Sequence, residues 1–182
     1  MFTGHFAAAL AGSGAAKRVP LALLIGGAFG SDILEGGVAA FRVHDPTRVW
    51  SHSLPATVAM GLLLALAWRA AGGSRKEAGI VMLVVLSHTA LDFFTATKTL
   101  WPGLHPLGLN LYHRPMIDAV VEGGLCVLGW AAWRASLPRE RRASMVAWSM
   151  LILLLVSQGA VLVDVVVGGP RVDWDSLSKF VR

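Results

Sequence analysis

Two ionisable side chains interrupt a segment that is otherwise apolar enough for lipid. After the run AGIVMLV the chain continues as VLSHTALDFF, which places His88 and Asp92 four residues apart. Residues at this spacing lie one turn apart on the same face of a helix, so the pair can present two ligands to one cation. An ionisable residue inside a membrane is costly unless it is paired or coordinated, and it therefore indicates a functional site.

Other ionisable residues in apolar segments lie at a similar depth. They are His5 in MFTGHF, Asp32 in GSDILE, His52 in WSHSL and Glu122 in the fourth predicted span. Counting about 1.5 Å of rise per residue from the helix ends places all of them, with the His-Asp pair, in one half of the bilayer. Five segments of the chain thus contribute polar groups to one layer.

Three explanations compete for this polar layer. Histidine and aspartate could form hydrogen bonds between helices, each worth about 0.6–2 kcal/mol. They could line a proton or solute path, although no charged relay continues to the other face. They could also bind a divalent metal ion, which would neutralise the buried carboxylates. Neutral imidazoles and carboxylates suit zinc, and iron, manganese or nickel are alternatives. We favour the metal site.

The composition indicates an integral membrane protein. Of the 182 residues, 55% are hydrophobic and 15% are charged, and the mean hydropathy is +0.62. Soluble domains usually carry about 25% charged residues. The net charge of +5 does not indicate nucleic-acid binding, because the basic residues are spread through short loops where they set orientation. The single cysteine, Cys126, excludes an internal disulfide or a cysteine metal cluster.

The hydropathy pattern predicts an all-α fold, a polytopic membrane helical bundle. Five full spans are expected near residues 20–40, 54–70, 77–98, 116–134 and 145–167. Residues 2–16 form a shorter helix of about 21 Å, which reaches only part of the way across. This segment lacks a basic n-region, so we interpret it as a retained helix and not a signal peptide. Residues 1–168 then form one membrane domain, and residues 169–182 form a short extramembrane tail.

The basic residues predict the orientation. Nine of the sixteen fall near Lys17 and in the connections 69–76 and 134–142, which the predicted spans place on one side. An excess of Lys and Arg in short loops is typical of the cytoplasmic face. The polar layer is therefore expected in the outer half of the membrane.

Five short motifs follow one another along residues 1–125. They are the Gly-His of MFTGHF, the aspartate of GSDILE, WSHSLP, LSHTALDFFT and WPGLHPLGLNLY, with Glu122 in the next helix. In this order they resemble the membrane-bound metal-dependent hydrolase-like proteins of the bacterial inner membrane. The resemblance implies that location, a hydrolytic activity and a His/Asp metal site. Leu34 departs from the pattern, because many members have a second acidic residue or a histidine near there. Another branch has a His-Arg-Gly before the Thr-His-Ser, of which this chain keeps only Arg48, and having fewer ligands than that branch weakens the case for a two-metal site.

The residues and the resemblance together give a mechanistic hypothesis. The expected metal ligands are His5, Asp32, His52, His88 and Asp92. A bound dication would lower the pKa of its water toward about 7 and polarise a phosphoryl or carbonyl oxygen. Glu122 or Glu35 would act as general base or orient a ligand imidazole. The depth of the site favours a substrate from the outer leaflet or periplasm, such as a lipid ester or phosphodiester.

Two non-enzymatic alternatives stay open. The chain could be a membrane subunit or partner-binding protein, in which the polar layer holds the helices together or binds a structural metal; a closed ligand set would favour this. It could also be a small permease. In each case the expected partners are membrane lipids, and in the first case other membrane protein subunits as well.

Overall fold

The computed structural model describes residues 2–40, 49–101 and 104–167, and its regular elements there are helices with one isolated β-bridge. The elements are α1 (Phe2–Ala15), α2 (Leu21–Ala28), α3 (Gly30–Ala40), α4 (Val49–His52), α5 (Leu54–Ala70), α6 (Arg75–Thr95), the 3-10 helix η1 (Leu111–His113), α7 (Pro115–Ser136), α8 (Arg139–Arg142) and α9 (Met145–Val167). The predicted all-helical architecture is confirmed for these residues. The predicted tail 169–182 lies outside them.

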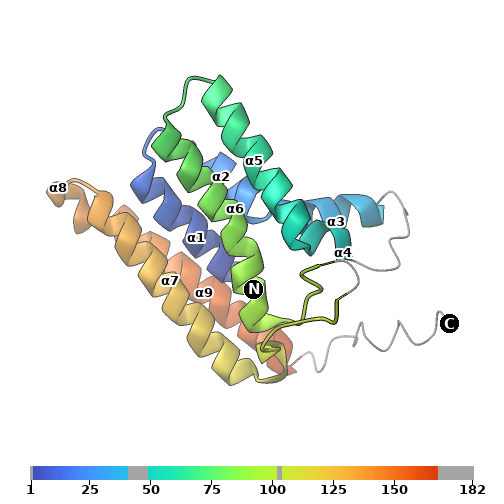
Figure 1. Ribbon diagram of the computed structural model, residues 1–182. Helices are drawn as coiled ribbons and strands as arrows, with labels where there is room; N and C mark the ends of the chain where they lie inside the picture. Colours follow the sequence, from blue (N-terminus) through green and yellow to red (C-terminus); the bar gives the residue numbers. More distant parts are fainter. Residues whose placement is uncertain (1, 41–48, 102–103, 168–182) are drawn as a thin grey trace.

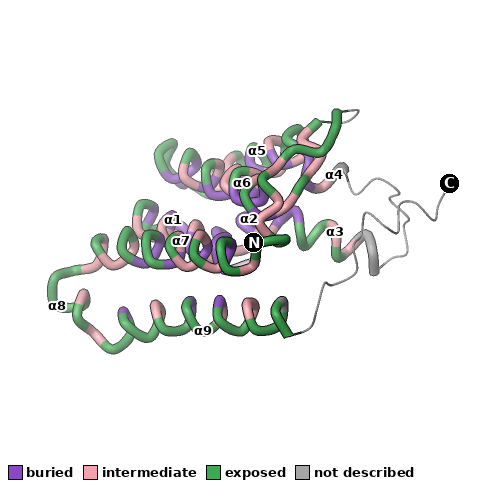
Figure 2. The backbone as a smooth tube through the Cα atoms, turned by 90° about the horizontal axis from the view of Figure 1, so that it is seen from below, coloured by how far each residue is buried: buried purple, intermediate pink, exposed green. Residues whose placement is uncertain are grey.

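The bundle is arranged around α1. This helix packs between α6 and α7, while α5 packs against α6 and α9 packs against α7 (Figure 1). Viewed along a perpendicular direction, α9 forms one edge of the bundle and most of its length is exposed (Figure 2). Although α1 has only 14 residues, it is therefore the most central helix. It contacts α6 on one side and α7 on the other.

Close packing on both sides of α1 follows from its small residues. One core cluster joins Ala9 to Leu24 of α2 and Val84 of α6, and a second joins Leu10 to Trp130 of α7. Gly129 allows the closest approach, since a Cβ atom there would lie 2.5 Å from the carbonyl oxygen of Ala7. Small residues let helix backbones approach in lipid, where van der Waals packing replaces the hydrophobic effect as the source of association.

The predicted set of five full spans is not supported. Among the described residues three helices, α6, α7 and α9, are long and apolar enough to cross a membrane. The predicted span 54–70 is helical as α5, but its 17 residues rise only about 26 Å, less than the roughly 30 Å of a hydrocarbon core. The predicted span 20–40 is divided at Phe29 into α2 and α3, because the helix ends there and begins again at Gly30.

Polar caps set the beginnings of α6, which carries two candidate ligands, and of α5, which follows His52. Ser74 and Glu77 form a capping box at the start of α6: the Ser74 hydroxyl accepts from the Glu77 amide at 3.2 Å, and the Glu77 carboxylate accepts from the Ser74 amide at 2.8 Å. Ser53 caps α5 by accepting from the Ala56 amide. This cap places His52 just before the start of a long helix.

The connections divide between two ends of the bundle. The α1–α2 and α5–α6 connections and α8, which hold most of the loop lysines and arginines, lie at one end, while the beginning of α1 lies at the other (Figure 1). The C-terminal end of α6 lies at this second end. α3 and α4 pack together beside it. The candidate ligands from α1, α3, α4 and α6 are therefore carried toward the same end.

Candidate metal centre

Three buried imidazoles from separate helices meet at the end of the bundle. The ring centroid of His88 on α6 lies 4.2 Å from that of His5 on α1 and 5.1 Å from that of His52 on α4. All three side chains are almost completely buried. Histidines from three separate segments therefore lie together in one buried group.

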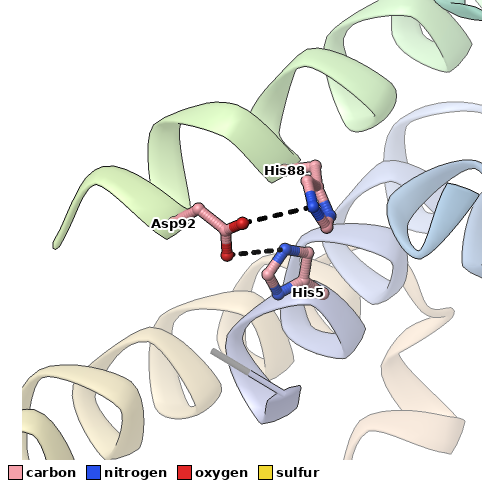
Figure 3. Close-up of side chains that lie close together, drawn as sticks. All are labelled: His5, His88 and Asp92. Carbon is pink, nitrogen blue, oxygen red and sulfur yellow. Dashed lines mark ion pairs between the residues drawn. The ribbon is translucent and has the colours of Figure 1, made fainter. Parts of the chain in front are cut away.

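The carboxylate of Asp92 lies among the three rings. Its Oδ1 is 3.7 Å from Nε2 of His5, and its Oδ2 is 3.4 Å from Nε2 of His88 (Figure 3). The same Oδ2 is 3.6 Å from Nε2 of His52. Asp32, from the first turn of α3, completes the group: its Oδ1 is 3.1 Å from Nε2 of His52 and 4.0 Å from Nε2 of His88. All five predicted ligands thus converge.

These separations fit the edges of a coordination polyhedron. Neighbouring ligands of a tetrahedral ion with bonds of about 2.0–2.1 Å lie about 3.3 Å apart, and the nitrogen–oxygen distances here range from 3.1 to 4.0 Å. Two overlapping ligand sets have all their donor atoms within 4.8 Å of one another, His5–His88–Asp92 and Asp32–His52–His88. The residues present therefore fit a divalent metal ion, and the shared His88 joins the two sets.

The main chain fixes the tautomer of His88. Its Nδ1 lies 2.8 Å from the carbonyl oxygen of Ala28. A carbonyl oxygen only accepts hydrogen bonds, so Nδ1 donates to it, which leaves Nε2 facing Asp92. This Nε2 is buried, and Oδ2 of Asp92 lies 3.4 Å from it, beyond the ordinary hydrogen-bond distance. In a neutral ring of this tautomer, Nε2 would present a lone pair to a metal ion.

The interruption between α2 and α3 supplies this carbonyl. Ala28 is the last residue of α2, and the carbonyl groups of a final helical turn need partners outside the helix. The ring of His88 provides one for Ala28. The break that divides the predicted span 20–40 therefore orients the imidazole of His88, and it also places Asp32 in the first turn of α3.

A carboxylate also orients His52. Its Nδ1 lies 3.3 Å from Oε2 of Glu35 and 3.0 Å from Oγ of Ser51. A carboxylate at one ring nitrogen favours the proton there and leaves the other nitrogen for a metal, as in carboxylate–histidine–zinc arrangements. The structure therefore places Glu35 behind a ligand imidazole, one of the two roles expected for it from the sequence.

One side of the centre is open. The side chain of Asp32 is 48% exposed, whereas the three imidazoles are buried. Asp32 therefore lies on the side where solvent reaches the centre.

Lys98 is a site residue that the sequence analysis did not single out. Its Nζ lies 3.8 Å from Oδ2 of Asp92, and its side chain is 31% exposed. Two main-chain hydrogen bonds pair Lys98 with Leu107, and the Leu109 amide donates to the carbonyl of Phe93 at 2.7 Å, so this segment is tied to the end of α6. In the sequence, only its position six residues after Asp92 marks Lys98 as a possible site residue. A lysine at the end of a span is ordinarily interpreted as an interfacial anchor.

Glu122 belongs to a different group of residues. Thr3, Glu122 and Gln158, here called the Thr3 cluster, lie buried between α1, α7 and α9. The Thr3 hydroxyl donates to Oε2 of Glu122 at 2.6 Å and also contacts Oε1 of Gln158. Glu122 is in neither of the two ligand sets. The structure thus brings together six residues at the centre, including Lys98, and places this predicted glutamate in the second polar cluster.

Comparison of this chain with family models, with curated proteins and with solved structures found no match. The resemblance to the hydrolase-like membrane proteins, drawn from the short motifs, therefore stays a prediction.

Proposed function

We propose that the protein is a membrane-embedded, metal-dependent hydrolase whose metal ion is held by His5, His52, His88, Asp92 and Asp32. One observation carries this proposal: three imidazoles surround one carboxylate, and the Ala28 carbonyl holds His88 in the tautomer that presents a lone pair. The His/Asp donor set suits zinc best among the common divalent ions. The motif resemblance points to the same class of protein.

The open side distinguishes this centre from a purely structural metal site. Structural zinc sites are closed, whereas catalytic sites keep a position for water or substrate. Asp32 borders solvent, and Lys98 reaches the centre from the same end of α6. A bound dication would supply Lewis-acid polarisation of a substrate oxygen and acidify a coordinated water.

The surrounding residues have separate tasks in this proposal. Ala28 and Glu35 orient the imidazoles of His88 and His52 through their Nδ1 atoms. Lys98 carries a positive charge beside Asp92 and would pair with an anionic oxygen of the substrate. A lipid phosphodiester or ester, entering from the leaflet beside the centre, fits this arrangement.

The proposed location is the bacterial inner membrane, with the centre in the outer half and the basic connections in the cytoplasm. The three helices long enough to span the membrane would then be accompanied by α5, α2 and α3, each of which is shorter than a full span. Lysine and arginine at the opposite end of the bundle support this orientation.

Purified protein in detergent tests the proposal. Elemental analysis should find stoichiometric zinc, and hydrolysis of bis(p-nitrophenyl) phosphate or of a p-nitrophenyl ester should stop with a chelator and return with added zinc. His88→Ala should lose both metal and activity, while His113→Ala, an exposed histidine at the same end, should lose neither. Folded protein that binds no metal at micromolar zinc would overturn the proposal. Bound metal without hydrolysis of either substrate would favour the non-enzymatic subunit.

A further inference from the structure

Helix α3 meets the candidate metal centre through two carboxylates. Asp32 and Glu35 are three residues apart, so they lie on one face of the helix. Oδ1 of Asp32 lies 3.1 Å from Nε2 of His52, and Oε2 of Glu35 lies 3.3 Å from Nδ1 of the same ring. The contact of Asp32 with Nε2 of His88 is longer, at 4.0 Å. α3 thus approaches the centre with two acidic side chains, and both contact one imidazole.

The other four candidate ligands belong to helices that pack closely together. α1 packs against α6, and α5, which begins just after His52, packs against α6 as well. The four residues are at most 6% exposed: His5, His52, His88 and Asp92. The side chain of Asp32 is 48% exposed. Of the five candidate ligands, Asp32 is therefore the one carried by a helix outside this packed group.

α3 is anchored at its first residue and extends away from the bundle. Gly30 is buried against Met60 of α5, so closely that a side chain at this position would displace the methionine. Further along, Leu34 is 51% exposed, and a Cβ atom at Gly36 or Gly37 would meet no atom within 4 Å. The main helix contacts of α3 are with α2 and α4, and it projects sideways from the other helices (Figures 1 and 2). Packing therefore holds one end of α3 and little of the remainder.

The residue between α2 and α3 has the position of a hinge. Phe29 has φ of −101° and ψ of 7°, whereas a helical residue has ψ near about −42°, so the direction of the chain changes here. Hinges are usually a few residues at the ends of elements, which absorb a change in φ and ψ. Elements with few buried contacts also open at a low cost in free energy. Rotation at Phe29 would move Asp32 and Glu35 relative to the centre.

His52 alone does not hold both carboxylates of α3. A neutral imidazole carries one N–H group, so His52 can donate to Asp32 or to Glu35 but not to both. Lys98 lies 3.8 Å from Asp92 and compensates that carboxylate. A divalent cation among the candidate ligands would add the positive charge that the second contact of α3 requires. The position of α3 against the centre should therefore depend on the ion.

We infer, building on the metal centre of the proposed function, that α3 is a hinged arm that closes on this centre from its solvent side. With the cation bound, Asp32 and Glu35 hold the arm against His52. Without it, the arm turns away about Phe29. Asp32 joins the ligand set through this movement, whereas the other four ligands are in place before it. The arm thus controls access to the centre from solvent, for the ion and for a substrate.

Distances between spin labels test the arm. The buried native cysteine is first removed by Cys126→Ala. Labels at Leu34→Cys on α3 and Leu83→Cys on α6, both exposed positions, then report the position of α3. Zinc-loaded protein should give one narrow distance, and a chelator should broaden the distribution or add a longer distance. Labels at Leu83→Cys and at Leu153→Cys, an exposed position of α9, form the control pair and should give the same distance in both states.

Substitution of the Asp32 carboxylate tests how the arm closes. Asp32→Asn should remove the narrowing by zinc, because the arm then lacks its ligand. It should weaken zinc binding by about tenfold, the lower end of the loss for an outer partner, since the four buried ligands remain. Asp118→Asn, at a carboxylate of α7 outside both ligand sets, is the matched control and should narrow with zinc as the native protein does. The control pair of labels shows that each variant is folded.

The measurement separates the arm from the hydrolase. An equally narrow distance with and without zinc, in protein that elemental analysis shows to bind the metal, would overturn the arm and leave the proposed function. Narrowing by zinc without hydrolysis of either p-nitrophenyl substrate would support the arm and overturn the hydrolase. Protein that binds no zinc would overturn both.

Discussion

The metal centre and the Thr3 cluster are both buried between helices, but their polar atoms are satisfied in different ways. In the Thr3 cluster a hydroxyl donates directly to the Glu122 carboxylate at 2.6 Å, which is a hydrogen bond between helices. At the candidate metal centre the imidazole nitrogens lie 3.4–3.7 Å from Asp92, which is long for a hydrogen bond, although His52 and Asp32 are joined by one at 3.1 Å. Similar residue types thus make a direct hydrogen bond between helices in one place and a group with the spacing of metal ligands in the other.

The two clusters are two residues apart on the same helix. Thr3 and His5 both lie in the first turns of α1, and residues at this spacing face opposite sides of a helix. Thr3 therefore faces α7 and α9, while His5 faces α6. If the contrast between the clusters is correct, substitutions on the His5 side should change metal binding, and substitutions on the Thr3 side should change only stability.

Loss of the His88 imidazole should have the largest effect. His88→Ala should weaken zinc binding by more than about 100-fold, because it removes a ligand, whereas loss of an outer partner costs about 10–100-fold. Competition with a chromophoric chelator measures the affinity. His113→Ala should bind zinc as the native protein does. Native affinity in folded His88→Ala would mean that the imidazole cluster holds helices together as the Thr3 cluster does.

Glu35→Gln should have the next largest effect. Glu35 contacts the Nδ1 atom of His52, so its charge supports a ligand from behind. The substitution should weaken zinc binding by about 10–100-fold. Glu140→Gln, at an exposed glutamate of α8, is the matched control. Unchanged zinc affinity with a lower kcat would instead assign Glu35 to the reaction itself. It would then be the general base, which is the other role that the sequence allows for it.

Lys98→Met should separate substrate binding from metal binding. The lysine contacts Asp92, but it belongs to the segment that follows α6 and is partly exposed. The KM for an anionic phosphodiester should rise about tenfold or more, which is the size of a lost hydrogen bond between charged groups, while the KM for a neutral ester stays the same. Lys98→Arg should recover part of the loss. A fall in zinc content of Lys98→Met would show that Lys98 supports the metal centre and does not select the substrate.

The grouping of the candidate ligands could be predicted from the sequence because residue type and depth carried most of the information. Histidines and aspartates are costly in apolar segments, so His5, His52, His88 and Asp92 were conspicuous there, and counting residues from the helix ends placed them at one level. Depth does not say which way a side chain faces, however. Glu122 was expected at the same level, but its side chain belongs to the Thr3 cluster.

Two features of the site could not be read from residue types. The Ala28 carbonyl is a main-chain group, and its role depends on a helix break that hydropathy averages over, since the segment 20–40 is apolar on both sides of Phe29. Lys98 carries the ordinary signature of a residue at the end of a span, and only the pairing of Lys98 with Leu107 directs it back toward Asp92. The orientation of the Ala28 carbonyl and the position of Lys98 both depend on local backbone geometry, which a pattern of residue types does not contain.

Thr3→Val should have the smallest effect and gives the sharpest test of the contrast between the clusters. Valine matches threonine in shape but cannot donate to Glu122, so the free energy of unfolding in detergent should fall by about 0.6–2 kcal/mol. Zinc affinity and kcat should not change, and Thr97→Val, at an exposed threonine, should alter neither quantity. If Thr3→Val weakened zinc binding, the first turns of α1 would be linking the two clusters, because a shift of Thr3 would displace His5 two residues away. The hydrogen bond to Glu122 would then act as a support for the metal centre, and the proposed separation between a packing cluster and a binding cluster would be wrong.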